Sequence, residues 1–275
     1  MSFTTMDDNS VDSQIYGSDY FLERCGGVEF FQKYGYSVLK PAIQFAVQQA
    51  ELKTADRILD IGCGRGELVA HLDEKGFDAT GIDYSEAAVS CAKALYPKGK
   101  FHLVRSDQPL FEAASFDKIF ILGTIEHLYE PEIEKTLLEV KRLLRPGGLC
   151  VITTCTNALY YKTRSYRLRA ALASLLKMAP PSPSHSEEDK AMHVNEKQYF
   201  SLSRSLRTLG LPFRVIACPN PKLASIELYG GNLPPDFPLR PKAPWKQFLY
   251  RTFVFHFPLN LMLARSYAAV IRAAA

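Results

Sequence analysis

The chain has no apolar run long enough to cross a bilayer. Its longest apolar stretch, residues 252–264, is interrupted by His256, Pro258 and Asn260, and it is shorter than the about 20 residues that a spanning helix needs. The N-terminal residues are polar and acidic rather than basic and then apolar, which is not typical of a signal peptide. We therefore expect a cytoplasmic protein without a membrane-spanning helix, and peripheral contact with the inner face of a membrane stays open.

Cysteine and histidine motifs for metal binding are missing as well. The six cysteines are scattered without a CxxC pair, and no histidine spacing suits zinc, so we predict a reducing compartment and no metal site. The net charge of +4 is too small by itself to indicate nucleic acid. The 275 residues suffice for one large α/β domain with additions, because a domain usually takes roughly 100–200 residues.

Short apolar segments alternate with helical ones from residue 57 to residue 154. This alternation with short connections is the pattern of a doubly wound parallel sheet. Two later strands are expected to close the sheet after a break in the pattern. The predicted strands are 57–61, 78–82, 101–105, 117–122, 149–154, 213–218 and 224–229, and the predicted helices include 36–50, 85–95 and 131–144.

A glycine-rich turn, RILDIGCGRGELV at residues 57–69, follows the first of these strands. Gly62, Gly64 and Gly66 stand between an apolar strand and the start of a helix. Glycine allows positive φ or the close approach of a ligand, and a helix N-terminus attracts an anion. The turn therefore predicts a nucleotide-type cradle. A dinucleotide fingerprint would need glycine where Glu67 stands, and no GK[ST] follows, which excludes a P-loop.

Three acidic residues stand where strands of this sheet end. Asp60 directly precedes the glycine-rich turn, Asp83 ends the second strand, and Asp107 follows the third. Ligands of open α/β sheets bind at the carboxyl ends of the strands. The carboxylate of Asp83 could accept hydrogen bonds from both hydroxyls of a ribose. The carboxylate of Asp107 could accept a hydrogen bond from an exocyclic amine such as that of adenine.

These residues belong to a set of motifs that resembles a known family. The chain resembles the class I S-adenosylmethionine (SAM)-dependent methyltransferases of the small-molecule type over roughly residues 45–155. The resemblance implies SAM as cofactor and a Rossmann-like seven-stranded sheet, mostly parallel with an antiparallel last strand. The matching pieces are LDIGCGRGE (59–67), GIDYSEAAV (81–89), SDQPL (106–110), FDKIFILGTIEHL (116–128) and LLEVKRLLRPGGLCVITT (137–154).

The same resemblance implies a set of cofactor-binding residues. They are Asp60, Gly62, Cys63 and Gly64 around the methionine end of SAM, Asp83 on the ribose, Tyr84 against the adenine, Asp107 and Gln108 at the adenine edge, and Leu122, Gly123 and Thr124 beside the sulfonium arm. Elementary electrostatics agrees, because an amino-acid carboxylate suits a helix N-terminus and flanking acids suit a cationic ligand.

Two histidines are the candidate catalytic residues. His127 follows the fourth strand, and His193 precedes a late helix. A neutral imidazole titrates near the working pH, so either ring could act as a general base. The alternative is that His127 only holds its loop or contacts the cofactor backbone and that His193 is a surface loop residue.

The chain divides into three predicted parts. Residues 1–44 form an aromatic N-terminal segment that caps the active site, residues 45–230 form the methyltransferase domain with a helical lid at about 158–195, and residues 231–275 form a basic and aromatic C-terminal extension. In that extension Trp245, Leu249, Phe253 and Phe257 recur every fourth residue. This pattern fits a helix at a membrane interface, or one that packs on the protein or on a second subunit.

The sequence thus predicts an enzyme that transfers the SAM methyl group to a small-molecule acceptor. Oxygen is the preferred acceptor atom, nitrogen and carbon stay open, and the acceptor could be lipid-linked. One alternative is a SAM-binding protein without methyl transfer that serves as an interaction or regulatory partner. Nucleic-acid methylation is disfavoured, because GTIEHL at 123–128 is not the NPP-type motif of enzymes that methylate a flipped base.

Overall fold

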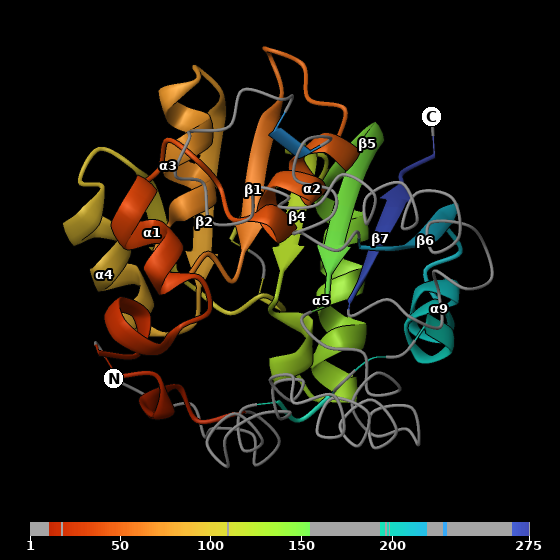
Figure 1. The fold of residues 1–275 in the computed structure, drawn as a ribbon. Helices are drawn as coiled ribbons and strands as arrows, with labels where there is room; N and C mark the ends of the chain where they lie inside the picture. Colours follow the sequence, from red (N-terminus) through yellow and green to blue (C-terminus); the bar gives the residue numbers. More distant parts are fainter. Residues whose placement is uncertain are drawn as a thin grey trace, which may run out of the picture.

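The core of the protein is a mixed β-sheet, seen in the computed structural model, which describes residues 11–17, 19–108, 110–154, 193–195, 197, 199–218, 228–229 and 266–274. Within these residues the sheet has seven strands in the order β3-β2-β1-β4-β5-β7-β6 (Figure 1). The strands are β1 (Arg57–Ile61), β2 (Asp78–Asp83), β3 (Lys100–Leu103), β4 (Phe116–Leu122), β5 (Leu144–Thr153), β6 (Phe213–Ala217) and β7 (Tyr267–Arg272). The five strands from β1 to β5 pair in parallel, and β7 is antiparallel to both of its neighbours. The predicted fold class is confirmed.

The last strand does not come from the predicted segment. We expected residues 224–229 to complete the sheet, but residues 228–229 are helical and the position between β5 and β6 is taken by β7. The residues from Tyr267 to Ile271 are all buried. A strand covered on both faces needs such a continuous apolar run, and YAAVIR provides one. Part of the predicted C-terminal extension is therefore a central strand.

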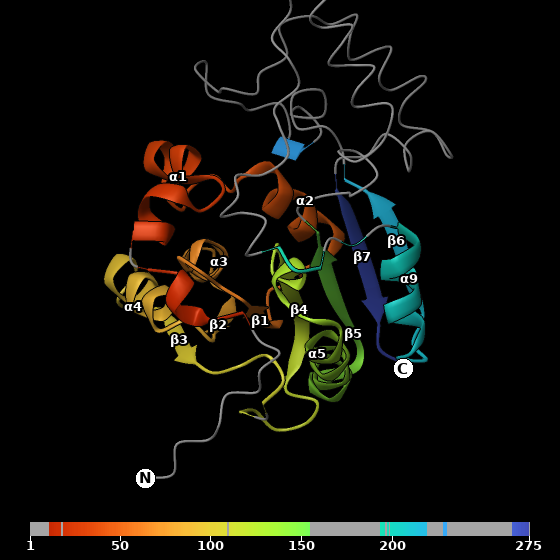
Figure 2. The ribbon, with the colours of Figure 1, turned by 90° about the horizontal axis from the view of Figure 1, so that it is seen from below.

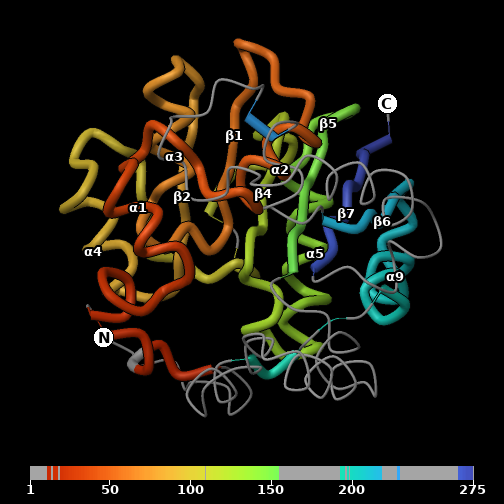
Figure 3. The backbone as a smooth tube through the Cα atoms, viewed as in Figure 1, coloured from red at the N-terminus to blue at the C-terminus, as the bar shows by residue number. Residues whose placement is uncertain are grey.

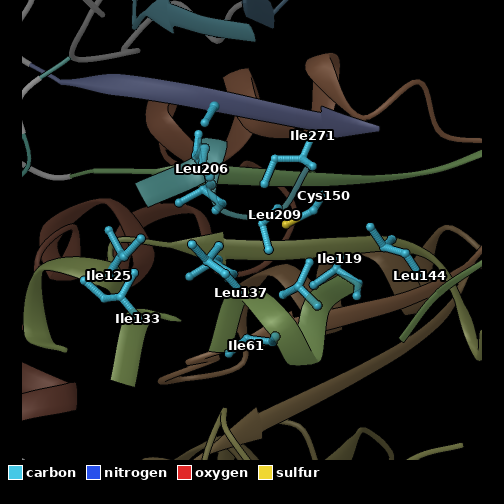
Figure 4. Packing of buried hydrophobic residues seen from close by; sticks show 14 of the residues in the cluster. Ile61, Ile119, Ile125, Ile133, Leu137, Leu144, Cys150, Leu206, Leu209 and Ile271 are labelled. Atoms are coloured by element: carbon cyan, nitrogen blue, oxygen red, sulfur yellow. The ribbon is translucent and has the colours of Figure 1, made fainter. Parts of the chain in front are cut away.

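Helices cover both faces of the sheet. On one face α2 (Pro41–Gln49), α3 (Glu67–Glu74) and α4 (Glu86–Leu95) pack against apolar residues of the strands. On the other face α5 (Glu130–Leu143) and α9 (Tyr199–Arg207) do the same, and Figure 4 shows Leu137 and Leu206 against the sheet residues Ile119 and Ile271. The view in Figure 2 shows the two layers on opposite sides of the strands.

The remaining elements are short. They are η1 (Ser13–Ile15), η2 (Tyr20–Arg24), α1 (Val28–Tyr34) and η3 (Ile125–His127). The single helix predicted over 36–50 is wrong at its start: α1 ends before Gly35, whose φ is +56°, and α2 begins at Pro41. Proline suits the first turn of a helix because it has no N–H to donate, which explains the later start.

The carboxyl ends of the parallel strands gather chain segments that are distant in sequence. In Figure 3 the first described N-terminal residues (red) and the short segment 193–195 both lie at this end. Among the described residues, no helix is long and apolar enough to span a membrane. The predicted lid up to residue 192, the segment 230–265 with its four aromatic and apolar positions, and the predicted N-terminal residues up to 10 lie outside the described residues.

Candidate functional site

The glycine-rich turn is anchored to the end of β2. The backbone N–H groups of Gly62 and Cys63 donate to the Ile82 carbonyl over 2.8 and 3.0 Å. A Cβ atom on Gly62 would lie 2.3 Å from the Thr124 hydroxyl, so glycine is needed there for packing within the protein. A Cβ atom on Gly64 would meet only the Phe21 ring, at 3.7 Å. At Gly64, therefore, the protein's own packing does not require glycine in the way that it does at Gly62, although the positive φ of +51° still favours it.

Asp83 ends β2 directly opposite this turn. Its carboxylate accepts hydrogen bonds from the backbone N–H of Gly64 and of Ser85, both over 3.0 Å. The backbone of Tyr84 is a third hydrogen-bond partner. Burial nevertheless raises the pKa of Asp83 above its ordinary value, because the ionised form loses water that these backbone bonds only partly replace. A carboxylate has about four acceptor positions, so about one remains for a ligand.

Asp60 is a second buried acid close to Asp83. It is 5% exposed, and burial followed by repulsion from Asp83 raises its pKa to about 7. Lys40 acts in the opposite direction, since its positive charge lowers the pKa of Asp60. A carboxyl with this pKa loses its proton readily when a cation binds beside it.

A cavity opens beside these residues. Of the residues predicted to contact the cofactor, four contribute to its wall together with the catalytic candidate His127, and they come from the ends of β1, β2 and β4. The lining residues are Val11, Ile61, Gly62, Ile82, Asp83, Tyr84, Val104, Arg105, Ser106, Thr124, His127, Leu128 and Glu132.

Several predicted contact residues do not line this cavity. Asp107 is held by Arg105, whose Nε donates to its carboxylate over 3.1 Å, and Gln108 is exposed. The remaining predicted contacts lie within two positions of lining residues in the chain but are not part of the cavity wall; they are Asp60, Cys63, Gly64, Leu122 and Gly123. Burial raises the pKa of the Cys63 thiol well above its ordinary value, as expected of a cysteine that fills space.

Sequence reasoning missed an ion-paired wall of the cavity. Arg105 also donates from Nη2 to Glu132, at 2.9 Å, and both residues line the cavity. Glu132 in turn accepts from the backbone N–H of Tyr129 at the start of α5. The motif SDQPL singles out Asp107 as the residue of interest. Arg105, just before that motif, was the feature of the sequence from which the ion pair could have been predicted.

The N-terminal aromatic segment packs over the glycine-rich turn. The Phe21 ring lies beside Gly64, and Tyr16 packs edge-on against Tyr84 with ring centroids 6.1 Å apart. The buried Arg65 holds this segment, since its Nη1 donates to the Phe21 carbonyl over 2.7 Å. Tyr16 and Phe21 of this segment therefore pack on the domain, and Val11 reaches the cavity wall.

His127 and His193, the two catalytic candidates, lie side by side. Their ring centroids are 4.7 Å apart, although 66 positions separate them in the chain. The Asn195 N–H donates to the Glu126 carbonyl over 3.0 Å and fixes the segment of His193 against η3. The Tyr16 hydroxyl and Nδ1 of His127 form a hydrogen bond of 2.9 Å. The structure thus places His127, which lines the cavity, in contact with both His193 and Tyr16.

Comparisons with known proteins support the resemblance to methyltransferases. Residues 59–152 match the family described as methyltransferase domain. A ubiquinone biosynthesis O-methyltransferase of Thiobacillus denitrificans is 29% identical over 160 residues, which are 56% of this chain and 64% of that protein. An EEF1A lysine methyltransferase 4 of Bos taurus is 30% identical over 135 residues, 43% of this chain and 52% of that protein. The chain therefore spans less than two thirds of either relative.

A solved structure supports the fold independently. Phosphoethanolamine N-methyltransferase 2 of Haemonchus contortus, in complex with SAM, has a TM-score of 0.57 and 17% identity. The match covers 94% of this chain and 60% of that one. At this identity the likeness concerns the arrangement of strands and helices only.

Proposed function

The chain carries a class I SAM-dependent methyltransferase domain, and on this premise we propose that it transfers the methyl group of SAM to a hydroxyl oxygen of a small molecule. The observation that carries the proposal is the histidine pair, with centroids 4.7 Å apart, of which His127 lines the same cavity as Asp83. A neutral hydroxyl must lose its proton as it is methylated, and a nearby imidazole can accept that proton. A relative named as an O-methyltransferase supports the same choice of atom.

The residues present fit SAM. Asp83 has about one acceptor position left for a ribose hydroxyl, and Gly64 offers backbone that carries no side chain of its own. Asp60, Asp83 and Glu132 surround the region with negative charge, which suits a ligand with an ammonium and a sulfonium group. When bound, SAM supplies a methyl group that is already activated, so the chain mainly has to orient the acceptor in line with it.

We assign the cofactor contacts as the motifs suggest. Asp60, Gly62, Cys63 and Gly64 surround the methionine end, Asp83 binds the ribose, and Tyr84 lies against the adenine. Asp107 and Gln108 serve the adenine edge, and Leu122, Gly123 and Thr124 lie beside the sulfonium. The cavity wall supports Gly62, Asp83, Tyr84 and Thr124 in these roles. Asp107 can accept from adenine only where its carboxylate has lone pairs beyond those used by Arg105.

The acid-base role of the histidines is tested by replacing each of them. If one ring accepts the hydroxyl proton, His127→Ala or His193→Ala should lower turnover by roughly 10²–10⁴ while SAM affinity is retained. His102→Ala is the matched control, because His102 is an exposed histidine at β3 and away from the cavity wall. Small and equal losses in all three variants would return both residues to structural roles.

The acceptor class is tested with a cell extract and SAM that carries a labelled methyl group. The extract is separated by size into a protein fraction and a small-molecule fraction before incubation, and mass spectrometry locates the label. The proposal is supported if label appears in the small-molecule fraction with the wild-type protein and is lost with the Asp83→Ala variant. Label in proteins would favour the activity in the name of the bovine relative, a lysine methyltransferase. SAM binding without any labelled product would favour a protein that binds SAM without methyl transfer.

A lipid-linked acceptor is the finer part of the proposal. Residues 236–275 hold six Lys or Arg against one acid, which suits an anionic surface. Because Tyr267–Arg272 is a sheet strand, any membrane contact would have to come from the residues before it. Co-sedimentation with anionic liposomes tests this: binding that falls with salt and needs Trp245 and Phe253 supports it, and protein that stays in the supernatant at low salt refutes it.

A further inference from the structure

We propose that Glu126, His127 and His193 bind a divalent transition-metal cation at the end of the cavity. Each of the three side chains offers one ligand atom, and these atoms all lie within 4.8 Å of one another. Ligand atoms around one zinc-type cation, each about 2.1 Å from it, lie roughly 3–4 Å apart, so small side-chain rotations would complete the site. The sequence predicted no metal site, because these ligands follow no zinc-type spacing.

The backbone holds the three ligands together without the cation. Glu126 and His127 are consecutive in η3, and the Asn195 N–H bonds to the Glu126 carbonyl. Farther along, Nζ of Lys197 donates to both carboxylate oxygens of Glu130 over 2.6 and 2.7 Å, which fastens the segment of His193 to the start of α5. The fold thus places ligands from distant parts of the chain close together before the cation binds. Binding therefore does not include the entropic cost of ordering them.

The surroundings resemble those of metal-bound histidines. Such a ring usually forms a hydrogen bond through one nitrogen to an outer partner that fixes its orientation, and Tyr16 forms such a bond to Nδ1 of His127. Glu126 is 1% exposed. A carboxylate so deeply buried is costly as an ion, and a cation ligated to it offsets that cost. Both observations are independent of the distance criterion that defines the cluster.

The donor set indicates the kind of cation. Two imidazoles with one carboxylate suit Zn²⁺, Fe²⁺, Mn²⁺ or Co²⁺, whereas Mg²⁺ and Ca²⁺ prefer oxygen ligands only. Three protein ligands leave coordination positions open, as in catalytic sites. Since His127 lines the cavity, a hydroxyl of a molecule bound there could occupy an open position.

The use of the cation rests on the proposed function. An acceptor hydroxyl bound to it would ionise near neutral pH, as water bound to zinc does. Its proton leaves to solvent, a carbon–oxygen bond to the methyl group forms, and the carbon–sulfur bond of the sulfonium breaks, which leaves S-adenosylhomocysteine. In this arrangement His127 and His193 act on the hydroxyl through the cation rather than as bases.

Metal binding is tested without any substrate, so its outcome is separate from that of the proposed function. Untagged protein is treated with EDTA, freed of the chelator, and titrated with Zn²⁺ and with Co²⁺, whose visible spectrum reports the ligand field. We expect one cation per chain. Glu126→Gln and His193→Ala should weaken binding by at least about tenfold, Tyr16→Phe should weaken it by about tenfold, and the exposed control His102→Ala should not.

Two results would overturn the inference. The first is wild-type protein that binds neither cation with a stoichiometry near one. The second is equal affinity of the His193→Ala and His102→Ala variants, which would place the cation elsewhere. Circular dichroism and the affinity for S-adenosylhomocysteine check that each variant is folded, and Glu126→Gln, which keeps the size of the side chain, stays informative if an alanine variant is not. Turnover of a labelled extract with and without added cation then shows whether the site serves methyl transfer.

Discussion

The buried carboxyl of Asp60 makes cofactor affinity depend on pH in a way that one substitution should remove. Its pKa of about 7 means that it is mostly protonated in the free protein at pH 5.5. We propose that the ammonium group of the cofactor's methionine end lies beside it. That positive charge would favour the ionised form, so binding should release the proton and should tighten as the pH rises toward 7.

The size of the effect follows from the fraction of ionised Asp60 in the free protein. With a pKa near 7 in the free protein and a much lower one in the complex, affinity should rise about fifteenfold from pH 5.5 to pH 7. The same linkage predicts release of close to one proton per site at pH 5.5 and of about one half at pH 7. The window stays below the usual α-amino pKa of about 7.7–8.0, so the ligand keeps its charge.

Calorimetry with S-adenosylhomocysteine in two buffers of different ionisation enthalpy measures affinity and proton release together. This ligand has the ammonium but not the sulfonium, which reduces any contribution from protonated histidines near the cavity. Asp60→Asn is the matched variant, since it copies the neutral form of the side chain. We expect its affinity to stay flat between pH 5.5 and pH 7. A slope equal to that of the wild type would assign the titration to other groups.

Asp60→Asn should also change the stability of the free protein. The folded state raises the pKa of Asp60 from 3.8 to about 7, so between these pH values it keeps a proton that the unfolded chain has lost. Unfolding is therefore favoured as the pH rises through this window, by at most about 4 kcal/mol at pH 7. Asparagine lacks this penalty. Chemical denaturation at pH 5 and pH 7 should show that the stability of the variant relative to wild type increases between the two pH values, by roughly 2 kcal/mol.

Three further changes test other parts of the structure. Asp83→Ala should weaken SAM binding by about 1.5–3 kcal/mol, the cost of losing a hydrogen-bonded charged group, and unchanged affinity in calorimetry would remove Asp83 from the ribose site. Gly64→Val should obstruct the cofactor while the protein stays folded; Gly76→Val controls for strain, because both glycines have positive φ and Gly76 has open space around it. Ile271→Ala should cost about 2–5 kcal/mol in urea denaturation, since the residue is fully buried, and a smaller loss than for a surface residue would contradict its central position.

The first five strands were predictable because each is specified by its own residues. A short buried strand followed by a helix with an apolar face is a local pattern, and the observed bounds of β1 and β2 differ from the predicted ones by one residue at most. The seventh strand was not predictable in the same way. Which late apolar segment pairs with β5 depends on contacts across the sheet, and YAAVIR at 267–272 pairs there while residues 228–229 are helical.

The candidate site shows the same division. The glycine-rich turn and Asp83 follow one another across neighbouring strands, so sequence alone predicted their encounter, and the bond from Gly64 to Asp83 confirms that they meet. Asp107 was predicted to face the ligand, yet Arg105 holds its carboxylate. Arg105 stands only two residues before Asp107 and is visible in the sequence. Its pairing with Asp107 also depends on Glu132 of α5, however, because Glu132 accepts from the same guanidinium.

The two sides of the site are therefore specified by different kinds of contact. The side assigned to SAM is made of strand ends and the turn between them, which the sheet fixes. The other side is made of Tyr16, η3 and the segment of His193. These parts meet through hydrogen bonds, such as the one between Tyr16 and His127 and the one from Asn195 to Glu126. Changes in the segments 11–17 and 193–195 can alter what lies opposite the methyl group without disturbing the strands. One such sheet can therefore serve different acceptors, and we propose that the acceptor of this protein binds at the histidine pair rather than at the glycine-rich turn.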